Sequence, residues 1–108
     1  NGAYDAKFDD AFELVYDAGT PSAILTDEKS GRAIEMTTDR NAVIFFITNP
    51  AVADHEGDRE WFDANPYNAV ALEAQTLSDA IHHPEFGDIV LPAGEKRSYT
   101  TTYAFKNL

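Results

Sequence analysis

Short runs of strand-forming residues, separated by turn residues, are the feature that most constrains the fold of this chain. No segment carries three turns of clean helical periodicity, whereas six runs are rich in β-branched and aromatic residues and are bounded by Gly, Pro, Asn or Asp. The predicted strands are Ala11–Tyr16, Ala23–Thr26, Ala33–Thr38, Val43–Thr48, Asn68–Gln75 and Ser98–Phe105. Because 108 residues suit one small core, we expect residues 1–108 to form a single unit of all-β, antiparallel β-sandwich class.

Two local patterns refine this prediction. The segment Asp27-Glu28-Lys29-Ser30-Gly31 separates two predicted strands, and its glycine can adopt the positive φ that a tight hairpin requires. We therefore expect those two strands to pair antiparallel. In the last strand Tyr99, Tyr103 and Phe105 alternate with small polar residues, so they share one face, which we expect to belong to the core.

The charge of the chain excludes several classes of ligand. Eight Lys and Arg stand against 19 Asp and Glu, which gives a formal net charge of −11. Such a surface repels the phosphate backbone of nucleic acid and anionic lipid. The few cations are scattered along the sequence and form no phosphate clamp. We therefore expect a neutral small-molecule ligand and neither nucleic acid nor membrane as a partner.

Cysteine and hydropathy set the expected compartment. The chain has no cysteine, which excludes a disulfide framework and a thiolate metal site. It also lacks an apolar run of the roughly 18–20 residues that a membrane span needs, and no basic-then-apolar leader opens it. These observations predict a protein of the reducing cytoplasm.

One predicted strand carries an acid and an amide on a face otherwise lined by small side chains. Within Asn68–Gln75 the side chains alternate, so Glu73 and Gln75 share one face with alanines while Val70 and Leu72 point to the other. A solvated outer sheet face is the commoner meaning of such alternation. The alternative is a ligand-binding face, where alanines leave room and the two polar groups supply an acceptor and a donor.

Five motifs follow one another in the second half of the chain, and two more lie in the first half. The later ones are Leu72-Glu73-Ala74-Gln75, Ser78-Asp79-Ala80, Pro84-Glu85-Phe86, Leu91-Pro92-Ala93-Gly94-Glu95 and Thr101-Thr102-Tyr103-Ala104-Phe105. The earlier ones are Phe8-Asp9-Asp10-Ala11-Phe12-Glu13-Leu14 and Ser30-Gly31-Arg32 with Val43-Ile44-Phe45-Phe46. In order and spacing these motifs resemble the end of an aldose 1-epimerase, also called galactose mutarotase.

The resemblance implies a fold, an activity and a partner. The fold would be the galactose mutarotase-like supersandwich, a large β-sandwich of which this chain resembles about the last third. The activity would be interconversion of the α and β anomers of hexoses such as galactose or glucose, without metal or organic cofactor. The partners would be the sugar and the remaining N-terminal part of the same enzyme.

The resemblance also assigns roles to three residues. Glu73 matches the catalytic glutamate, so it is implied to be the general base that takes the proton of the anomeric hydroxyl. Asp9 matches the acid that hydrogen-bonds sugar hydroxyls, although by itself it would be interpreted as a turn residue. Gln75 either orients the Glu73 carboxylate, contacts the sugar, or is a structural amide.

The histidines and the rival functions complete the prediction. None of His55, His82 and His83 falls at a position that matches a family histidine, so the catalytic acid is expected upstream and the isolated chain is expected to be inactive. A non-catalytic carbohydrate-binding or sensory module is the first rival. An epimerase-like enzyme for phosphorylated hexoses would need an arginine clamp, which this sequence does not display. The last rival is an interaction module with an acidic β-sandwich surface.

Overall fold

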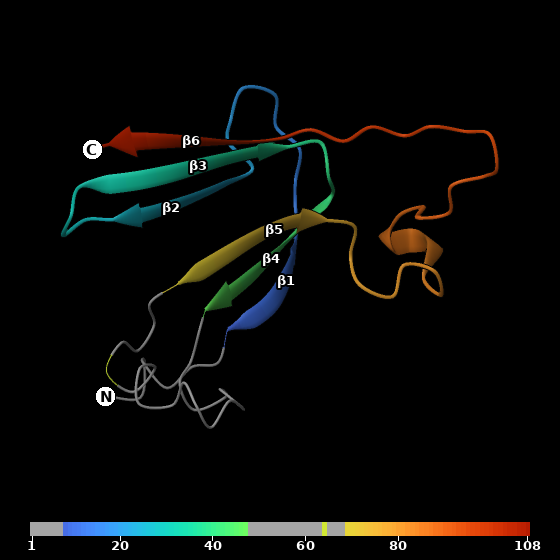
Figure 1. The fold of residues 1–108 in the computed structure, drawn as a ribbon, viewed down its shortest axis with the longest axis horizontal. Coiled ribbons are helices and arrows are strands. Elements are labelled where there is room, and N and C mark those ends of the chain that lie inside the picture. Colours follow the sequence, from blue (N-terminus) through green and yellow to red (C-terminus); the bar gives the residue numbers. More distant parts are fainter. Residues whose placement is uncertain (1–7, 48–63, 65–68) are drawn as a thin grey trace.

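Six strands form two antiparallel sheets of three strands each in the computed structural model, which describes residues 8–47, 64 and 69–108 (Figure 1). Sheet A has the order β1-β4-β5, with bounds Asp9–Glu13, Ala42–Ile47 and Val70–Gln75. Sheet B has the order β2-β3-β6, with bounds Ala23–Asp27, Arg32–Thr38 and Thr101–Asn107. A short 3-10 helix, η2, covers Pro84–Phe86. The prediction of an all-β, antiparallel β-sandwich class is confirmed.

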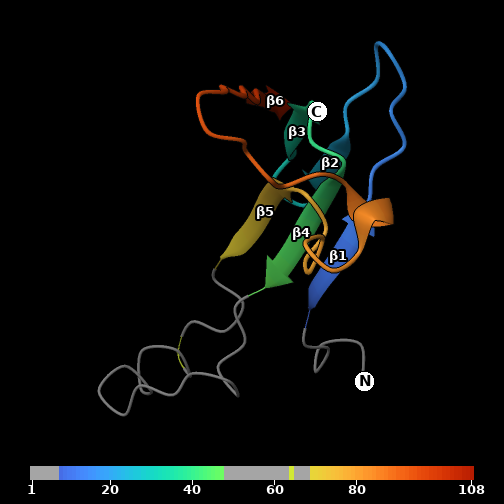
Figure 2. The ribbon, with the colours of Figure 1, turned by 90° about the vertical axis from the view of Figure 1, so that its right-hand side faces the viewer.

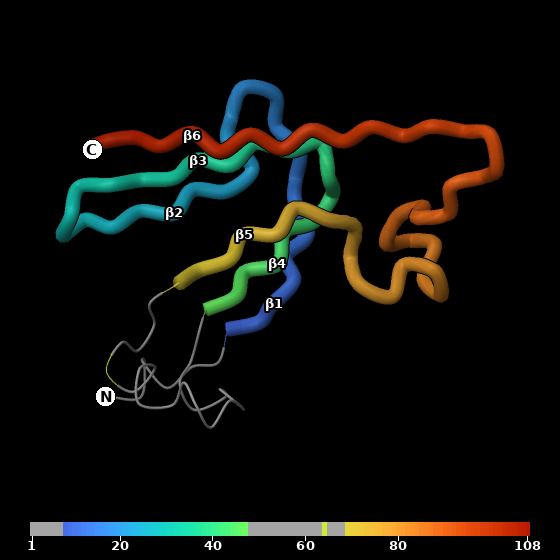
Figure 3. Tube along the Cα trace, viewed as in Figure 1, coloured from blue at the N-terminus to red at the C-terminus, as the bar shows by residue number. Residues whose placement is uncertain are grey.

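The chain alternates between the two sheets (Figure 3). β1 lies in sheet A, β2 and β3 in sheet B, β4 and β5 in sheet A, and β6 in sheet B. It passes from β1 to β2 through residues 14–22, from β3 to β4 through the short turn Asp39–Asn41, and from β5 to β6 through residues 76–100. β1 and β5 consequently lie on either side of β4, although they are far apart in sequence. This strand order is what brings the two acidic motifs into one sheet.

The six predicted strands exist, but two of them have different bounds. β1 occupies Asp9–Glu13 rather than Ala11–Tyr16, because β4 begins at Ala42, opposite Glu13, and past that pair the N–H of Leu14 bonds only to the carbonyl oxygen of Asn41 in the β3–β4 turn. Val15 and Tyr16 are consequently exposed. β6 occupies Thr101–Asn107 rather than Ser98–Phe105, since its partner β3 ends opposite Thr101 and begins opposite Asn107.

The other four strands match their predicted positions within two residues at each described end. Two ends of the predicted strands, Thr48 and Asn68, lie outside the described residues.

The predicted hairpin joins β2 to β3. The two strands pair antiparallel from Ala23↔Met36 to Asp27↔Arg32, and Gly31 has a φ of +69°. Its N–H donates to the carbonyl oxygen of Asp27 at 2.9 Å. A hydrogen bond from the Ser30 hydroxyl, assisted by backbone N–H groups, holds the pKa of the Asp27 carboxyl below its usual value. The prediction of an antiparallel pair with a positive-φ glycine is confirmed.

The core lies between the two sheets and is small. Met36 is fully buried, and Val43 is also buried, on the face of sheet A opposite to Ala42, Glu13 and Gln75. Phe8 packs edge-on against Phe45, with ring centroids 5.8 Å apart. The Tyr103 hydroxyl donates to the carbonyl oxygen of Leu72 at 2.7 Å and so ties β6 to β5 across the layers.

The aromatic face of the last strand points inward, but it is poorly covered. Tyr103 pairs with Met36 and Phe105 with Ile34, which places both rings on the inner face of sheet B. Tyr103 is nevertheless 44% exposed and Phe105 80% exposed, so the expected burial of this face is wrong for the described residues. Phe105, Ile34 and Leu25 instead line an open hollow of about 460 Å³.

Candidate active site

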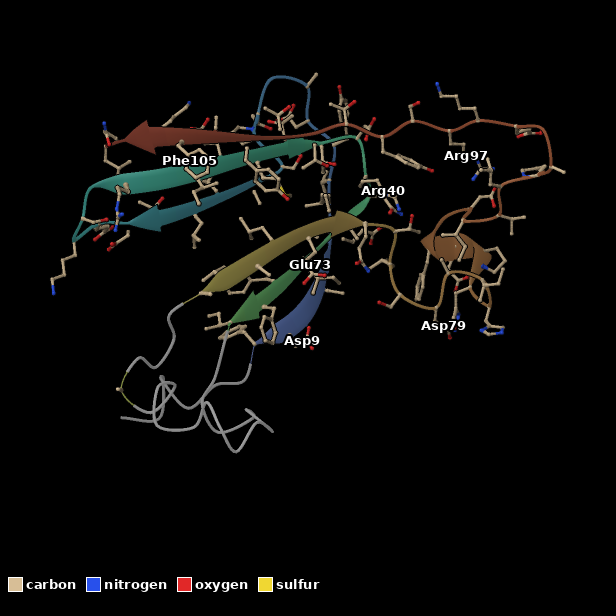
Figure 4. The ribbon with its side chains drawn as sticks, in the orientation of Figure 1. Asp9, Arg40, Glu73, Asp79, Arg97 and Phe105 are labelled. Atoms are coloured by element: carbon tan, nitrogen blue, oxygen red, sulfur yellow. The ribbon has the colours of Figure 1, made fainter. Side chains whose placement is uncertain are left out.

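Four of the five polar side chains in the strands of sheet A lie on one face, and Asp10 is the exception. In the register of the sheet, Asp9 lies opposite Phe46 and Ala71, while Glu73 lies opposite Ile44 and Ala11. Directly opposed residues of antiparallel strands point to the same side. Asp9 and Glu73 therefore share a face, and Figure 4 shows both on the side of sheet A that points away from sheet B.

Two further polar residues belong to this face. Glu13 lies opposite Ala42, which in turn lies opposite Gln75. We call the face that carries Asp9, Glu13, Glu73 and Gln75 the polar face of sheet A. The alternation within the strands predicted that Glu73 and Gln75 share a face, whereas Glu13 was missed. Its signal was its spacing from Asp9, since residues four apart in a strand lie on one side.

β4 supplies an apolar floor between the two acidic strands. Ile44 and Phe46 stand between Glu73 and Asp9, and Phe46 is 37% exposed. Neighbouring strands lie roughly 4.8 Å apart, so β1 and β5 are separated by about 10 Å across the sheet. A carboxylate on each outer strand with an apolar strand between them can hold a flat, hydroxyl-bearing ring from both sides.

Glu73 and Gln75 differ in their surroundings. Glu73 is exposed on the polar face, so its carboxylate is accessible to a ligand. Gln75 is half-buried, and its side-chain NH₂ donates to the carbonyl oxygen of Thr76 at 3.2 Å. That bond uses one of the two N–H donors of the amide, so the second N–H can still donate and the oxygen can accept a hydrogen bond.

The connection from β5 to β6 lies on the polar-face side of sheet A in both ribbon views (Figures 1 and 2). Its first part is fastened at two points to the β3–β4 turn. The Arg40 guanidinium donates to the Thr76 hydroxyl at 2.8 Å, and the Asn41 side-chain amide donates to the carbonyl oxygen of Phe86 at 2.7 Å. The segment that follows Glu73 is thus held beside the face on which Glu73 stands.

The two described histidines pair with acids of their own loop. Asp79 has a φ of +63° and its carboxylate lies 2.5 Å from Nδ1 of His82 and 3.5 Å from Nε2 of His83. His83 also stacks on Phe86, with centroids 4.9 Å apart. Asp79 holds a hydrogen-bonded turn, because its carbonyl oxygen accepts the N–H of His82. His55 lies outside the described residues.

Further along, an ion pair ties the ends of residues 88–97 together. Arg97 donates to the carboxylate of Asp88 at 2.7 Å and to its carbonyl oxygen at 2.9 Å. The N–H of Val90 and the Arg97 side chain hold the pKa of Asp88 below its usual value, and the same pair raises the pKa of Arg97. This pair restrains the segment between its two ends.

A pH prediction follows from the Asp88 pair. Because folding lowers the pKa of Asp88, its contribution to stability is complete above the ordinary carboxyl pKa of about 4 and is lost as the pH falls through the lower folded value. We expect Asp88→Asn to reduce the acid-side slope of the thermal midpoint below the ordinary carboxyl pKa of about 4. Thermal unfolding followed across that range measures it, with Glu28→Gln as the control. An unchanged slope would contradict the prediction.

Comparisons with known proteins decide the family. The sequence profile described as Aldose 1-epimerase matches residues 2–104. This chain belongs to the aldose 1-epimerase family. The resemblance drawn from the motifs is therefore confirmed.

Two curated relatives agree with this assignment. The chain is 40% identical over 99 residues to a maltose epimerase of Levilactobacillus brevis, an alignment that covers 92% of this chain and 27% of the relative. It is 37% identical over 111 aligned positions to an aldose 1-epimerase of Streptococcus thermophilus, which covers 93% of this chain and 30% of the relative. This chain thus spans less than a third of the length of these relatives. No solved structure gives a significant match.

Neither a membrane-spanning helix nor a cluster of metal ligands occurs among the described residues. None of the helices there has the length and apolar character that crossing a membrane requires. Among the same residues, no three His, Asp or Glu side chains come together as ligands for a metal ion.

Proposed function

We propose that this chain is the C-terminal part of an aldose 1-epimerase that interconverts the α and β anomers of hexoses such as galactose or glucose in the cytoplasm. Family membership supports the reaction class. The observation that carries the assignment of residues is the shared face of Asp9 and Glu73 across β4. Each acid lies within one of the motifs that resemble the family, and β1 and β5 carry them on either side of the apolar strand β4.

In this proposal Glu73 is the general base. Its carboxylate takes the proton of the anomeric hydroxyl, the hydroxyl oxygen forms the carbonyl of the open chain, and the bond between C1 and the ring oxygen breaks. An acid gives a proton to the departing ring oxygen. Rotation about the C1–C2 bond presents the other carbonyl face, and closure reverses the proton transfers, so Glu73 returns its proton. Charge and atoms balance without any other reactant.

Asp9 and Gln75 act as binding groups in the same scheme. Asp9 accepts hydrogen bonds from hydroxyls on the part of the ring remote from C1, which orients the anomeric hydroxyl toward Glu73. Gln75 stands next to Glu73 on the same face, and its free oxygen can accept a further hydroxyl. The acid that protonates the ring oxygen is assigned to the rest of the enzyme, whose N-terminal part is the proposed partner of this chain.

The exposed inner face of sheet B supports a larger parent protein. Tyr103 and Phe105, which share this face with Met36 and Ile34, are among the large apolar side chains that stay exposed here. Full burial of one such side chain contributes roughly 1.5–3 kcal/mol relative to leaving it exposed to water. A partner layer of the same enzyme would bury the inward-facing members of this set.

An epimerase for phosphorylated hexoses is less well supported. Its site would need cations for the phosphate, and three of the described cations are already engaged by other groups. Arg40 bonds Thr76, Arg97 pairs with Asp88, and Lys106 pairs with Glu35 at 2.5 Å. A neutral hexose is therefore the proposed substrate.

A polarimetric assay tests the proposed function. Freshly dissolved α-glucose, α-galactose and maltose would be followed to their anomeric equilibrium with the complete protein and with the isolated 108-residue chain. We expect the complete protein to accelerate at least one of these approaches to equilibrium, and the isolated chain to accelerate none. If the complete protein binds sugar without acceleration, the non-catalytic module replaces the enzyme. Acceleration by the isolated chain would contradict the assignment of the acid to another segment.

A further inference from the structure

The turn Asp39–Asn41 links more segments than any other short connection among the described residues. The Asp39 carboxylate accepts the N–H of Thr100 at 2.9 Å, and the Asn41 side chain holds Phe86. The carbonyl oxygen of Asn41 accepts the N–H of Leu14 at 2.8 Å, just past the end of β1. This three-residue turn therefore contacts the end of β1, the start of the β5–β6 connection and its final residues.

Arg40 is the member of this turn that reaches the end of β5. Its Nη2 donates to Oγ1 of Thr76 at 2.8 Å, across 36 residues of sequence. The same guanidinium lies over the ring of Tyr99, with the central carbon 3.8 Å from the ring centroid. A hydrogen bond with a charged donor is about twice as strong as a neutral one, and a cation over an aromatic face adds to it. Arg40 is half-buried, so solvent competes weakly for these contacts.

Thr76 lies just past the end of sheet A, so contacts from outside the sheet fix its position. The pairing of β4 with β5 ends at Ala42↔Gln75, and Thr76 is the next residue. Arg40 holds its hydroxyl, while Gly87 packs against its methyl group so closely that a Cβ on Gly87 would lie 3.1 Å from it. Thr76 is thus fixed from two sides immediately after the strand that carries Glu73.

We propose that Arg40 is a positioning residue of the sugar site. By fixing Thr76 it sets the place and twist of the end of β5, and hence where Gln75 and the Glu73 carboxylate stand relative to Asp9 on the far strand. This inference rests on the proposed function of Glu73. Reactions of this kind are sensitive to such placement, since a misplacement of 1 Å can cost roughly 100-fold in rate.

Kinetics of the complete protein test this proposal through a double-mutant cycle. Arg40→Met removes the donor and keeps the length of the side chain, and Thr76→Val removes the acceptor and keeps its shape. We expect each to lower kcat about tenfold with KM within roughly twofold, and the double variant to lose no more than the worse single one, because both remove the same bond. Arg40→Lys keeps the charge and one donor, so it should recover part of kcat. Arg32→Met, an exposed arginine of the β2–β3 hairpin that bonds Ser30, is the matched control and should keep kcat.

Hydrogen exchange supplies a readout that does not depend on catalysis. Amides at the end of β5 should exchange faster in Arg40→Met and in Thr76→Val, by similar factors, and at the parent rate in Arg32→Met. Losses of kcat that multiply in the double variant, or an unchanged kcat in either single variant, would overturn the positioning role. If Glu73→Gln keeps full activity, the proposed function fails instead, and that outcome is distinguishable because it concerns Glu73 alone.

Discussion

Glu73→Gln in the complete protein is expected to lower kcat for anomer interconversion by about 1,000-fold, in the range that general base catalysis contributes. A carboxamide has nearly the shape of the carboxylate but cannot accept the proton of the anomeric hydroxyl. The substitution keeps the exposed position on β5, so folding should be unaffected and KM should change by only a few-fold. Polarimetry with an α-anomer measures kcat, and thermal unfolding checks the fold.

A matched substitution separates this role from the general loss of a carboxylate on a strand. Glu35 lies on β3 in the other sheet and pairs with Lys106, so Glu35→Gln removes the same charge without touching the polar face. We expect Glu35→Gln to keep kcat within about twofold, since a surface ion pair contributes little. Equal losses in the two variants, or a folded Glu73→Gln protein with parental kcat, would rule out Glu73 as the base.

The strands could be predicted because their signal is local. Alternation of apolar and polar residues has a period of two in a strand, so the sequence alone places Glu73 and Gln75 on one side and Leu72 on the other. The position of a strand end is harder to predict from local sequence, because a strand ends where its partner strand ends. β1 ends at Glu13 because β4 begins opposite it, and no property of Leu14 or Val15 predicts that end.

The candidate site depends on strand order, which the sequence pattern does not contain. Asp9 and Glu73 meet because β4 pairs with β1 on one edge and with β5 on the other. From the residues alone Asp9 looked like a turn residue, and only the family motif pointed to a binding role. The structure describes its position on the polar face, whereas its contact with sugar stays a prediction.

Two other features depend on contacts that no local pattern predicts. The hydrogen bond between Arg40 and Thr76 joins the β3–β4 turn to the β5–β6 connection. The sequence of neither segment predicts contact with the other. The aromatic face of β6 shows the reverse difficulty. Alternation correctly predicts that Tyr103 and Phe105 share a face, but burial also requires a layer to cover it, and the described strands of sheet A reach only Tyr103.

Asp9→Asn is expected to lower kcat/KM by about 10- to 100-fold, mostly through KM. Hydrogen bonds to a charged group contribute roughly 1.5–3 kcal/mol, and Asn replaces one of the two acceptor oxygens by a donor. Because β4 separates Asp9 from Glu73, Asp9 would contact hydroxyls that do not react, and such contacts bind the ground state and the transition state alike. Initial rates over a range of sugar concentrations separate KM from kcat.

The neighbouring acid is the control for Asp9, and deoxy sugars identify its contact. Asp10 carries the same charge one residue later, but the alternation of β1 turns its side chain to the opposite face. We therefore expect Asp10→Asn to keep kcat/KM within about threefold. Deoxy sugars that each lack one hydroxyl would be compared with the full sugar. The sugar that lacks the hydroxyl bound by Asp9 should be a poorer substrate than the full sugar for the parent enzyme. For Asp9→Asn, the same deoxy sugar should be as good a substrate as the full sugar, or a better one. If every deoxy sugar loses the same factor with both enzymes, or if Asp10→Asn is as impaired as Asp9→Asn, Asp9 does not bind the sugar, and the substrate must be held by Glu73, Gln75 and groups outside sheet A.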